Sequence, residues 1–170
     1  RFDAPRELAS GELSRDFIDA KRGLSRGEGL RLACGVIADA VAAAGIAFDA
    51  VGGLTLGADQ FSHGVATFLG DDHEWFVVRK EAKGRGTDQL VEGAVLSPGT
   101  RVLLVDDVVT TGGSIQKAYR HVLDTGADVV AAVTLVDRSD MASDFFDSEG
   151  VVYLPLFTYR DLGIDPIKGA

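Results

Sequence analysis

Hydrophobic positions along this 170-residue chain follow two alternating patterns. The first is a short, nearly continuous apolar run, which predicts a strand buried on both faces; it occurs at 48–53, 75–78, 101–105, 128–136 and 151–156. The second has apolar side chains three and four positions apart, which predicts a helix; it occurs at 26–45, 60–69 and 114–125. This alternation predicts an α/β fold, with a mostly parallel central sheet flanked by helices in a single domain over residues 1–170.

Composition adds limits on the class of protein. Apolar residues make up 46% of the chain and charged residues 25%, as in ordinary globular domains. The lack of a signal peptide or an apolar run of about 18 residues, together with the single cysteine, Cys34, indicates a cytoplasmic protein without a membrane partner. The formal charge of −9 disfavours nucleic-acid binding, which depends on positive surface. The three histidines show no ligand spacing, so no transition-metal site is predicted.

The most informative motif is the string VLLVDDVVTTGGS at 102–114. It predicts a buried strand, then the paired carboxylates Asp106 and Asp107, then a Thr/Gly/Ser turn that opens the helix at 114–125. Backbone N–H groups of such a turn bind anions, and the carboxylates suit ribose hydroxyls or a divalent cation. The string therefore indicates a ribose-phosphate site, although strand–turn–helix connections without any ligand are common in α/β proteins. The glycine patterns of Walker and Rossmann dinucleotide sites are missing.

Three further segments follow predicted strands. Residues 52–59 form a glycine-rich loop that either holds pyrophosphate or only connects a strand to a helix. Residues 79–86 carry four cations among glycines, which suits either closure over a pyrophosphate or a solvated basic loop. Arg138, directly after a strand, either binds a substrate carboxylate or makes a surface ion pair. Because the carboxyl ends of parallel strands meet at one edge of a sheet, these segments predict one shared site.

Together these segments resemble the orotate phosphoribosyltransferases, a family within the type I phosphoribosyltransferases. The string at 102–114 is similar to their motif for 5-phosphoribosyl 1-pyrophosphate (PRPP). RKEAKGRG at 79–86 resembles their catalytic loop, R-K-x-x-K-x-H-G, and VEG at 91–93 continues it. LASGELSRDFIDAK at 8–21 resembles their N-terminal segment, and VDR at 136–138 matches their strand-end arginine. The five blocks agree in order and spacing, which separates the chain from most other phosphoribosyltransferases.

The resemblance implies a role for each matching residue. It assigns PRPP binding to four segments: the glycine-rich loop at 52–59 (the pyrophosphate loop), the first cations of the basic loop, the paired carboxylates, and the Thr/Gly/Ser turn at 110–114 (the phosphate turn). The PRPP-binding residues are Leu56, Gly57, Arg79, Lys80, Asp106, Asp107, Val108, Val109, Thr110, Thr111, Gly112, Gly113 and Ser114. The implied orotate-binding residues are Phe17, Ile18, Thr110 and Arg138. The implied catalytic residues are Lys83, Arg85 and Asp107, with Lys83 foremost.

The implied activity is the Mg²⁺-dependent conversion of orotate and PRPP to orotidine 5′-phosphate and pyrophosphate in UMP biosynthesis. Mg²⁺ is expected to arrive with PRPP, with Asp106 or Asp107 contributing through water and no direct protein ligand assigned. The resemblance also implies a substrate-side hood at 1–24 and a flexible catalytic loop at 79–93. It further implies a homodimer, in which that loop reaches the neighbouring subunit's site.

Three positions depart from the family pattern. Arg85 replaces a histidine, which keeps positive charge but cannot shuttle a proton near neutral pH. Ala9 replaces a lysine found in many members, and Leu56-Gly57 replaces a frequent aromatic–Lys pair. These changes leave two alternatives open: a phosphoribosyltransferase for another nucleobase, and a non-catalytic PRPP-sensing regulatory protein.

Overall fold

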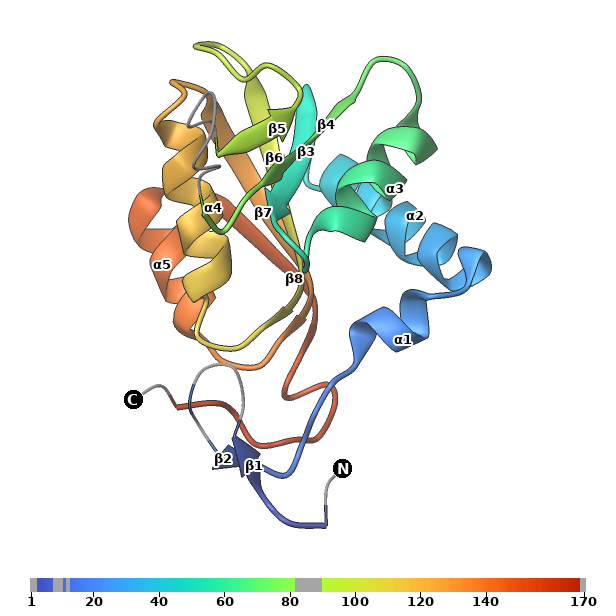
Figure 1. Cartoon of the computed structure of the whole chain (residues 1–170), viewed down its shortest axis with the longest axis vertical. Coiled ribbons are helices and arrows are strands. Elements are labelled where there is room, and N and C mark those ends of the chain that lie inside the picture. Colours follow the sequence, from blue (N-terminus) through green and yellow to red (C-terminus); the bar gives the residue numbers. More distant parts are fainter. Residues whose placement is uncertain (1–2, 8–10, 12, 82–89, 169–170) are drawn as a thin grey trace.

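The computed structural model describes residues 3–7, 11, 13–81 and 90–168 of the chain. A central sheet carries α2 (Gly27–Ala43) and α3 (Asp59–Leu69) on one face and α4 (Gly113–Leu123) and α5 (Met141–Glu149) on the other (Figure 1). The predicted α/β fold is therefore confirmed. Within the described ranges, no helix is both long enough and apolar enough to cross a bilayer.

Six strands of the described chain form this sheet, in the order β5-β4-β3-β6-β7-β8. Their bounds are β3 (Ala50–Leu54), β4 (Glu74–Val78), β5 (Val91–Gly93), β6 (Arg101–Val109), β7 (Asp128–Asp137) and β8 (Val152–Thr158). The edge strand β5 runs antiparallel to β4, and the other neighbouring pairs are parallel. The carboxyl ends of β3, β6 and β7 therefore open at the same edge of the sheet, where ligand sites of such folds form.

Each face of the sheet carries its own apolar core, because side chains alternate along a strand. Val102 and Leu104 of β6 belong to the core beneath α4 and α5, whereas Leu103 and Val105 belong to the core beneath α2 and α3. This double burial explains the continuous apolar run in β6. Cys34 lies in the second core, and burial raises the pKa of its thiol, as expected for an inert core cysteine.

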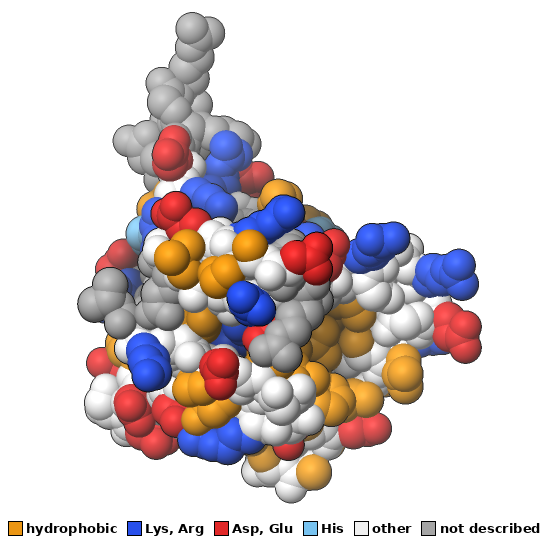
Figure 2. All heavy atoms as spheres, turned by 90° about the horizontal axis from the view of Figure 1, so that it is seen from below, with side chains coloured by type: hydrophobic (Ala, Val, Ile, Leu, Met, Phe, Trp, Pro, Cys, Tyr) orange, Lys and Arg blue, Asp and Glu red, His pale blue; other side chains and the backbone are white. Residues whose placement is uncertain are grey.

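The N-terminal segment lies below the sheet in Figure 1, at the carboxyl ends of the parallel strands. Its described part contains a two-stranded antiparallel ribbon, β1 (Arg6–Glu7) and β2 (Leu13–Ser14), and then α1 (Ala20–Leu24). The C-terminal segment passes the same end of the molecule. Seen from this end in Figure 2, Lys and Arg side chains are interspersed with acidic and apolar ones. The negative charge of the chain therefore does not make this face uniformly acidic.

Several elements differ from the sequence prediction. The strand expected at 101–105 continues to Val109, because β6 still pairs with β7 there, with Val109 opposite Asp137. Asp106 and Asp107 therefore lie inside the strand, and their expected place at its end is wrong. The strand expected from residue 48 begins at Ala50. The apolar pattern does not predict α1, α5 or β5, because α1 and β5 are too short to show a period and most α5 residues are polar.

Candidate functional site

The segment after β6 forms a turn that leads directly into α4. Gly112 has a φ of 81°, a left-handed conformation that glycine adopts without strain, and the helix begins at Gly113. A hollow of about 260 Å³ lies here, lined by Asp106 and residues 108–115. The hydroxyl of Ser139 donates to the carbonyl of Thr110 at 2.5 Å and fixes the start of the turn. Backbone N–H groups at the start of this 11-residue helix favour an anion in the hollow, which suits the predicted phosphate site.

Asp106 and Asp107 lie side by side next to this turn, and they are only 6% and 8% exposed. Oδ1 of Asp106 accepts the N–H of Asp107 at 2.9 Å, and Oδ1 of Asp107 accepts the N–H of Val108 at 2.8 Å. Burial, reinforced by the negative charge of Asp107, raises the pKa of Asp106 to about 7. The site thus holds two adjacent carboxyl groups with oxygens that suit ribose hydroxyls, one of them partly protonated near neutral pH.

The raised pKa of Asp106 predicts that the protein loses stability as the pH rises from about 4 to about 7. In the unfolded chain an aspartate titrates near a pKa of about 3.9. Between these values the folded state keeps a proton that the unfolded state has released, so the free energy of unfolding falls as the pH rises. Asp106→Asn removes this titration, and its amide oxygen can still accept the N–H of Asp107.

Denaturant unfolding of both proteins at pH 5 and pH 8 measures this effect. The free energy of unfolding of Asp106→Asn, relative to that of the wild type, should rise by about 2–3 kcal/mol from the lower to the higher pH. Titrations of all other groups are shared by the two proteins and largely cancel in the difference. A difference that stays constant with pH would contradict the prediction.

The glycine-rich loop after β3 meets the carboxylate pair directly. A Cβ atom added to Gly57 would lie 2.1 Å from Oδ1 of Asp106 and 2.9 Å from Oδ1 of Asp107, so only glycine allows this approach. The side-chain amide of Gln60 donates to the carbonyl of Gly57 at 2.8 Å and holds the loop against α3. The Leu56 side chain is exposed, and the peptide bond that precedes Leu56 is cis. The structure therefore brings together the two segments predicted to bind pyrophosphate and ribose.

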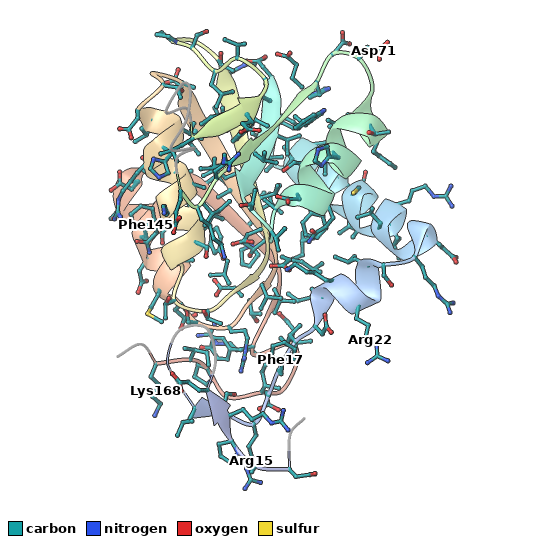
Figure 3. All side chains as sticks on the ribbon, viewed as in Figure 1. Arg15, Phe17, Arg22, Asp71, Phe145 and Lys168 are labelled. Atoms are coloured by element: carbon teal, nitrogen blue, oxygen red, sulfur yellow. The ribbon has the colours of Figure 1, made fainter. Side chains whose placement is uncertain are left out.

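A second pocket, of about 340 Å³, lies between the N-terminal segment and the phosphate turn. Its lining comprises Phe17, Ile18, Asp19, Ala20, Lys21, Asp107, Val108, Thr110, Ser114 and Arg138. All four residues predicted to bind orotate are therefore brought together here. Phe17, labelled in Figure 3, lies between the β1–β2 ribbon and the sheet and is 55% exposed. An accessible aromatic ring and a guanidinium in one pocket suit a flat anionic ligand.

Arg138 follows β7 and is 1% exposed. Its Nη1 donates to the carbonyl of Asp16 at 2.8 Å and its Nη2 to the hydroxyl of Ser14 at 3.1 Å, so the guanidinium fastens the N-terminal segment to the sheet. The neighbouring Asp137 accepts a hydrogen bond from the Tyr153 hydroxyl at 2.8 Å, and burial raises the pKa of its carboxyl group. The interpretation of Arg138 as a surface ion pair is wrong, because its side chain is buried.

The basic loop is described only at its two ends. Nη1 of Arg79 pairs with Glu92 of β5 at 2.9 Å. The ammonium of Lys117 on α4 donates to the carbonyl of Lys80 at 2.5 Å, which ties the start of the loop to the helix that follows the phosphate turn. Three positions that the sequence singled out lie outside the described residues: Ala9, Lys83 and Arg85.

Comparisons with known proteins agree with this geometry. Residues 28–148 match the family model of the phosphoribosyl transferase domain. The orotate phosphoribosyltransferase of Streptomyces coelicolor is 40% identical over 162 residues, which cover 93% of this chain and 87% of that relative. The chain belongs to the orotate phosphoribosyltransferases. The family expected from the motifs is thus confirmed over nearly the whole sequence.

Solved orotate phosphoribosyltransferases share the fold. The enzyme of Mycobacterium tuberculosis H37Rv in complex with Fe(III) dicitrate aligns with a TM-score of 0.81 and 34% identity, covering 96% of this chain and 91% of that one. The same enzyme in complex with PRPP aligns with a TM-score of 0.75 and 34% identity, covering 86% and 82%. The six-stranded sheet and its flanking helices are therefore a family fold and not a peculiarity of this chain.

Two polar residues at the site have no role assigned by the motifs. Lys21 belongs to the block at 8–21. Its ammonium donates to Oδ2 of Asp107, and the residue lines the pocket of the residues predicted to bind orotate. Ser139 directly follows Arg138 and holds the carbonyl of Thr110. Their only signal in the sequence is their position next to residues already singled out, because both contacts join segments far apart in the chain.

Proposed function

We propose that this chain transfers the 5-phosphoribosyl group of PRPP to orotate, giving orotidine 5′-phosphate and pyrophosphate in pyrimidine biosynthesis. The convergence of three features at one edge of the sheet carries the proposal: a hollow at the start of α4, a buried carboxylate pair and a pocket with an aromatic side chain and an arginine. The PRPP complex of the M. tuberculosis relative supports the donor. The relatives named orotate phosphoribosyltransferase support the acceptor.

In the proposed reaction, the bond from ribose C1 to the pyrophosphate oxygen breaks, and a bond from C1 to a ring nitrogen of orotate forms. That nitrogen gives up its proton, which the departing pyrophosphate takes. The ribose gains oxocarbenium character, so no covalent protein nucleophile is needed and the residues act by positioning and charge. The N–H groups of residues 110–114 hold the 5-phosphate. Asp106 and Asp107 accept hydrogen bonds from the ribose hydroxyls, and Gly57 lets the pyrophosphate loop lie next to them.

The acceptor binds in the pocket beneath the N-terminal segment. Phe17 and Ile18 contact the ring of the base, and Thr110 places the base next to the phosphate turn. Arg138 supplies positive charge for the carboxylate of orotate, which distinguishes this acceptor from uncharged nucleobases. Because Arg138 also holds Ser14 and Asp16, the same side chain shapes the pocket and selects its ligand.

Mg²⁺ enters the proposal together with PRPP. Asp106 and Asp107 offer the carboxylate oxygens that Mg²⁺ prefers, and the Oδ1 atoms of both lie toward the pyrophosphate loop at Gly57, so the residues present fit this ion. These carboxylates would hold the ion through water. When bound, the ion neutralises charge on the departing pyrophosphate.

Initial rates with PRPP, Mg²⁺ and one base at a time test the proposal. Turnover with orotate, and none with uracil, adenine, guanine or hypoxanthine, is the expected result. Turnover with another base alone would show a different acceptor, the outcome that the changes at Ala9 and Arg85 leave open. PRPP binding without turnover of any base would show a PRPP-sensing protein.

We also propose a homodimer in which residues 79–93 complete the neighbouring subunit's site. Lys83→Ala and Asp107→Asn would then remove parts of one site from different subunits. Random exchange makes half of the dimers hybrid, and each hybrid contains one intact site. At a PRPP concentration too low to fill the Asp107→Asn site, each variant alone should be nearly inactive, and mixing the two should restore about a quarter of the wild-type rate. A mixture as inactive as its components, although native mass spectrometry shows hybrid dimers, would place the loop in its own subunit's site.

A further inference from the structure

A lysine of the N-terminal segment contacts one oxygen of the carboxylate pair. Among the described residues, no backbone N–H donates to this oxygen. Lys21 lies on α1, and its ammonium donates to Oδ2 of Asp107, 86 positions away in the sequence. The other oxygen of Asp107 accepts the N–H of Val108 and lies toward Gly57. Lys21 is therefore placed where the ribose and acceptor parts of the site meet.

The position of the Lys21 ammonium relieves an electrostatic conflict within the site. PRPP carries several negative charges, yet its proposed ribose site consists of two adjacent, largely buried carboxyl groups. Uncompensated carboxylates there would repel the phosphates of the ligand, and the repulsion is stronger than in water because the site is partly desolvated. The ammonium of Lys21 offsets the charge of Asp107 and leaves Oδ1 of that residue facing the pyrophosphate loop.

Exposure indicates that the contact serves binding more than folding. The side chain of Lys21 is 51% exposed and that of Asp107 is 11% exposed. An ion pair with one partner half in solvent contributes little to folding stability. The same pair still fixes the orientation of a carboxylate that must receive a ligand, and a misdirected acceptor weakens binding without unfolding the protein.

We propose that Lys21 is a positioning residue for PRPP, which orients the Asp107 carboxylate toward the ribose and compensates its negative charge. The inference rests on the proposed function, because it takes PRPP as the donor. It does not depend on which base is the acceptor. Calorimetric binding of PRPP with Mg²⁺ therefore tests it separately from turnover.

Lys21→Met removes the charge and keeps most of the apolar stem. Its dissociation constant for PRPP should rise about tenfold, and the KM for PRPP should rise with it while kcat changes much less. Lys21→Arg keeps a cation in reach of Asp107 and should restore most of the affinity. Arg22→Met is the matched control, because Arg22 is the next residue of α1 and projects away from the sheet in Figure 3. It should bind PRPP as the wild type does.

A double-mutant cycle shows whether Lys21 acts through Asp107. In an Asp107→Asn background, Lys21→Met should change the PRPP affinity less than about twofold, since the partner charge is already gone. Wild-type affinity in Lys21→Met would overturn the inference, as would an equal loss in both backgrounds or in Arg22→Met. A wild-type protein that binds no PRPP would overturn the proposed function as well, whereas PRPP binding without orotate turnover would overturn the proposed transfer to orotate and leave this inference standing.

Discussion

Gly57→Ala should lower kcat/KM for PRPP at least about 100-fold while the protein stays folded. The added Cβ would lie 2.1 Å from Oδ1 of Asp106, which is far shorter than the van der Waals contact distance of the two atoms. Asp106 is buried and its Oδ1 is bound to the N–H of Asp107, so the carboxylate cannot move away without losing that bond. Either the loop retreats or the carboxylate pair turns. Both outcomes separate the ribose and pyrophosphate parts of the site.

Steady-state rates at varied PRPP, together with thermal unfolding, test this prediction. Gly27→Ala is the matched control, because nothing lies within 4 Å of a Cβ added at Gly27 and the backbone there is not left-handed. The control should keep wild-type kinetics. Near-wild-type kcat/KM in Gly57→Ala would mean that the loop at Gly57 and the carboxylate pair need not approach so closely during turnover.

Lys83→Ala should lower kcat by about 100- to 1,000-fold. Lys83 matches the central lysine of the family's catalytic loop, and the proposed reaction places negative charge on the departing pyrophosphate. A positioned cation stabilises that charge mainly in the transition state, so its loss reduces kcat more than it reduces ground-state affinity for PRPP. The folded protein should keep its unfolding temperature.

Rates at saturating PRPP and orotate give the measurement for Lys83→Ala. Arg120→Ala removes an exposed cation from the last turn of α4 and serves as the control for lost surface charge. The control should turn over at the wild-type rate. If kcat of Lys83→Ala stays within a few-fold of the wild-type value, the loop lysine has no part in the chemical step.

Much of the fold follows from local pattern, because helix and strand periods are short-range properties. The parallel strands appear as apolar runs since both of their faces are buried, and α2, α3 and α4 show helical spacing since one face of each packs on the sheet. The first and last residues of the helices and strands are harder to predict from the sequence. The extension of β6 to Val109 depends on its pairing with β7, which no local pattern of the string 101–109 reveals.

Some features of the candidate site can likewise be predicted from the sequence, and others cannot. The turn at 110–114 and the adjacent carboxylates are a contiguous string, so their chemistry is visible without a structure. The sequence shows Arg138 as an arginine at a strand end, but it does not show the hydrogen bonds of Arg138 to Ser14 and Asp16. The contact between the ammonium of Lys21 and Asp107 cannot be seen in the sequence either, because the two residues lie 86 positions apart.

The α/β class, the family and the PRPP-type turn can be predicted without a structure, because each depends on short motifs and on the order in which they follow one another along the chain. The folded chain was needed to show that Gly57 lies against the carboxylate pair, that Arg138 is buried under the N-terminal segment and that the ammonium of Lys21 contacts Asp107. These are contacts through space between distant segments. Packing of the whole chain sets them, together with the burial that raises the pKa of Asp106.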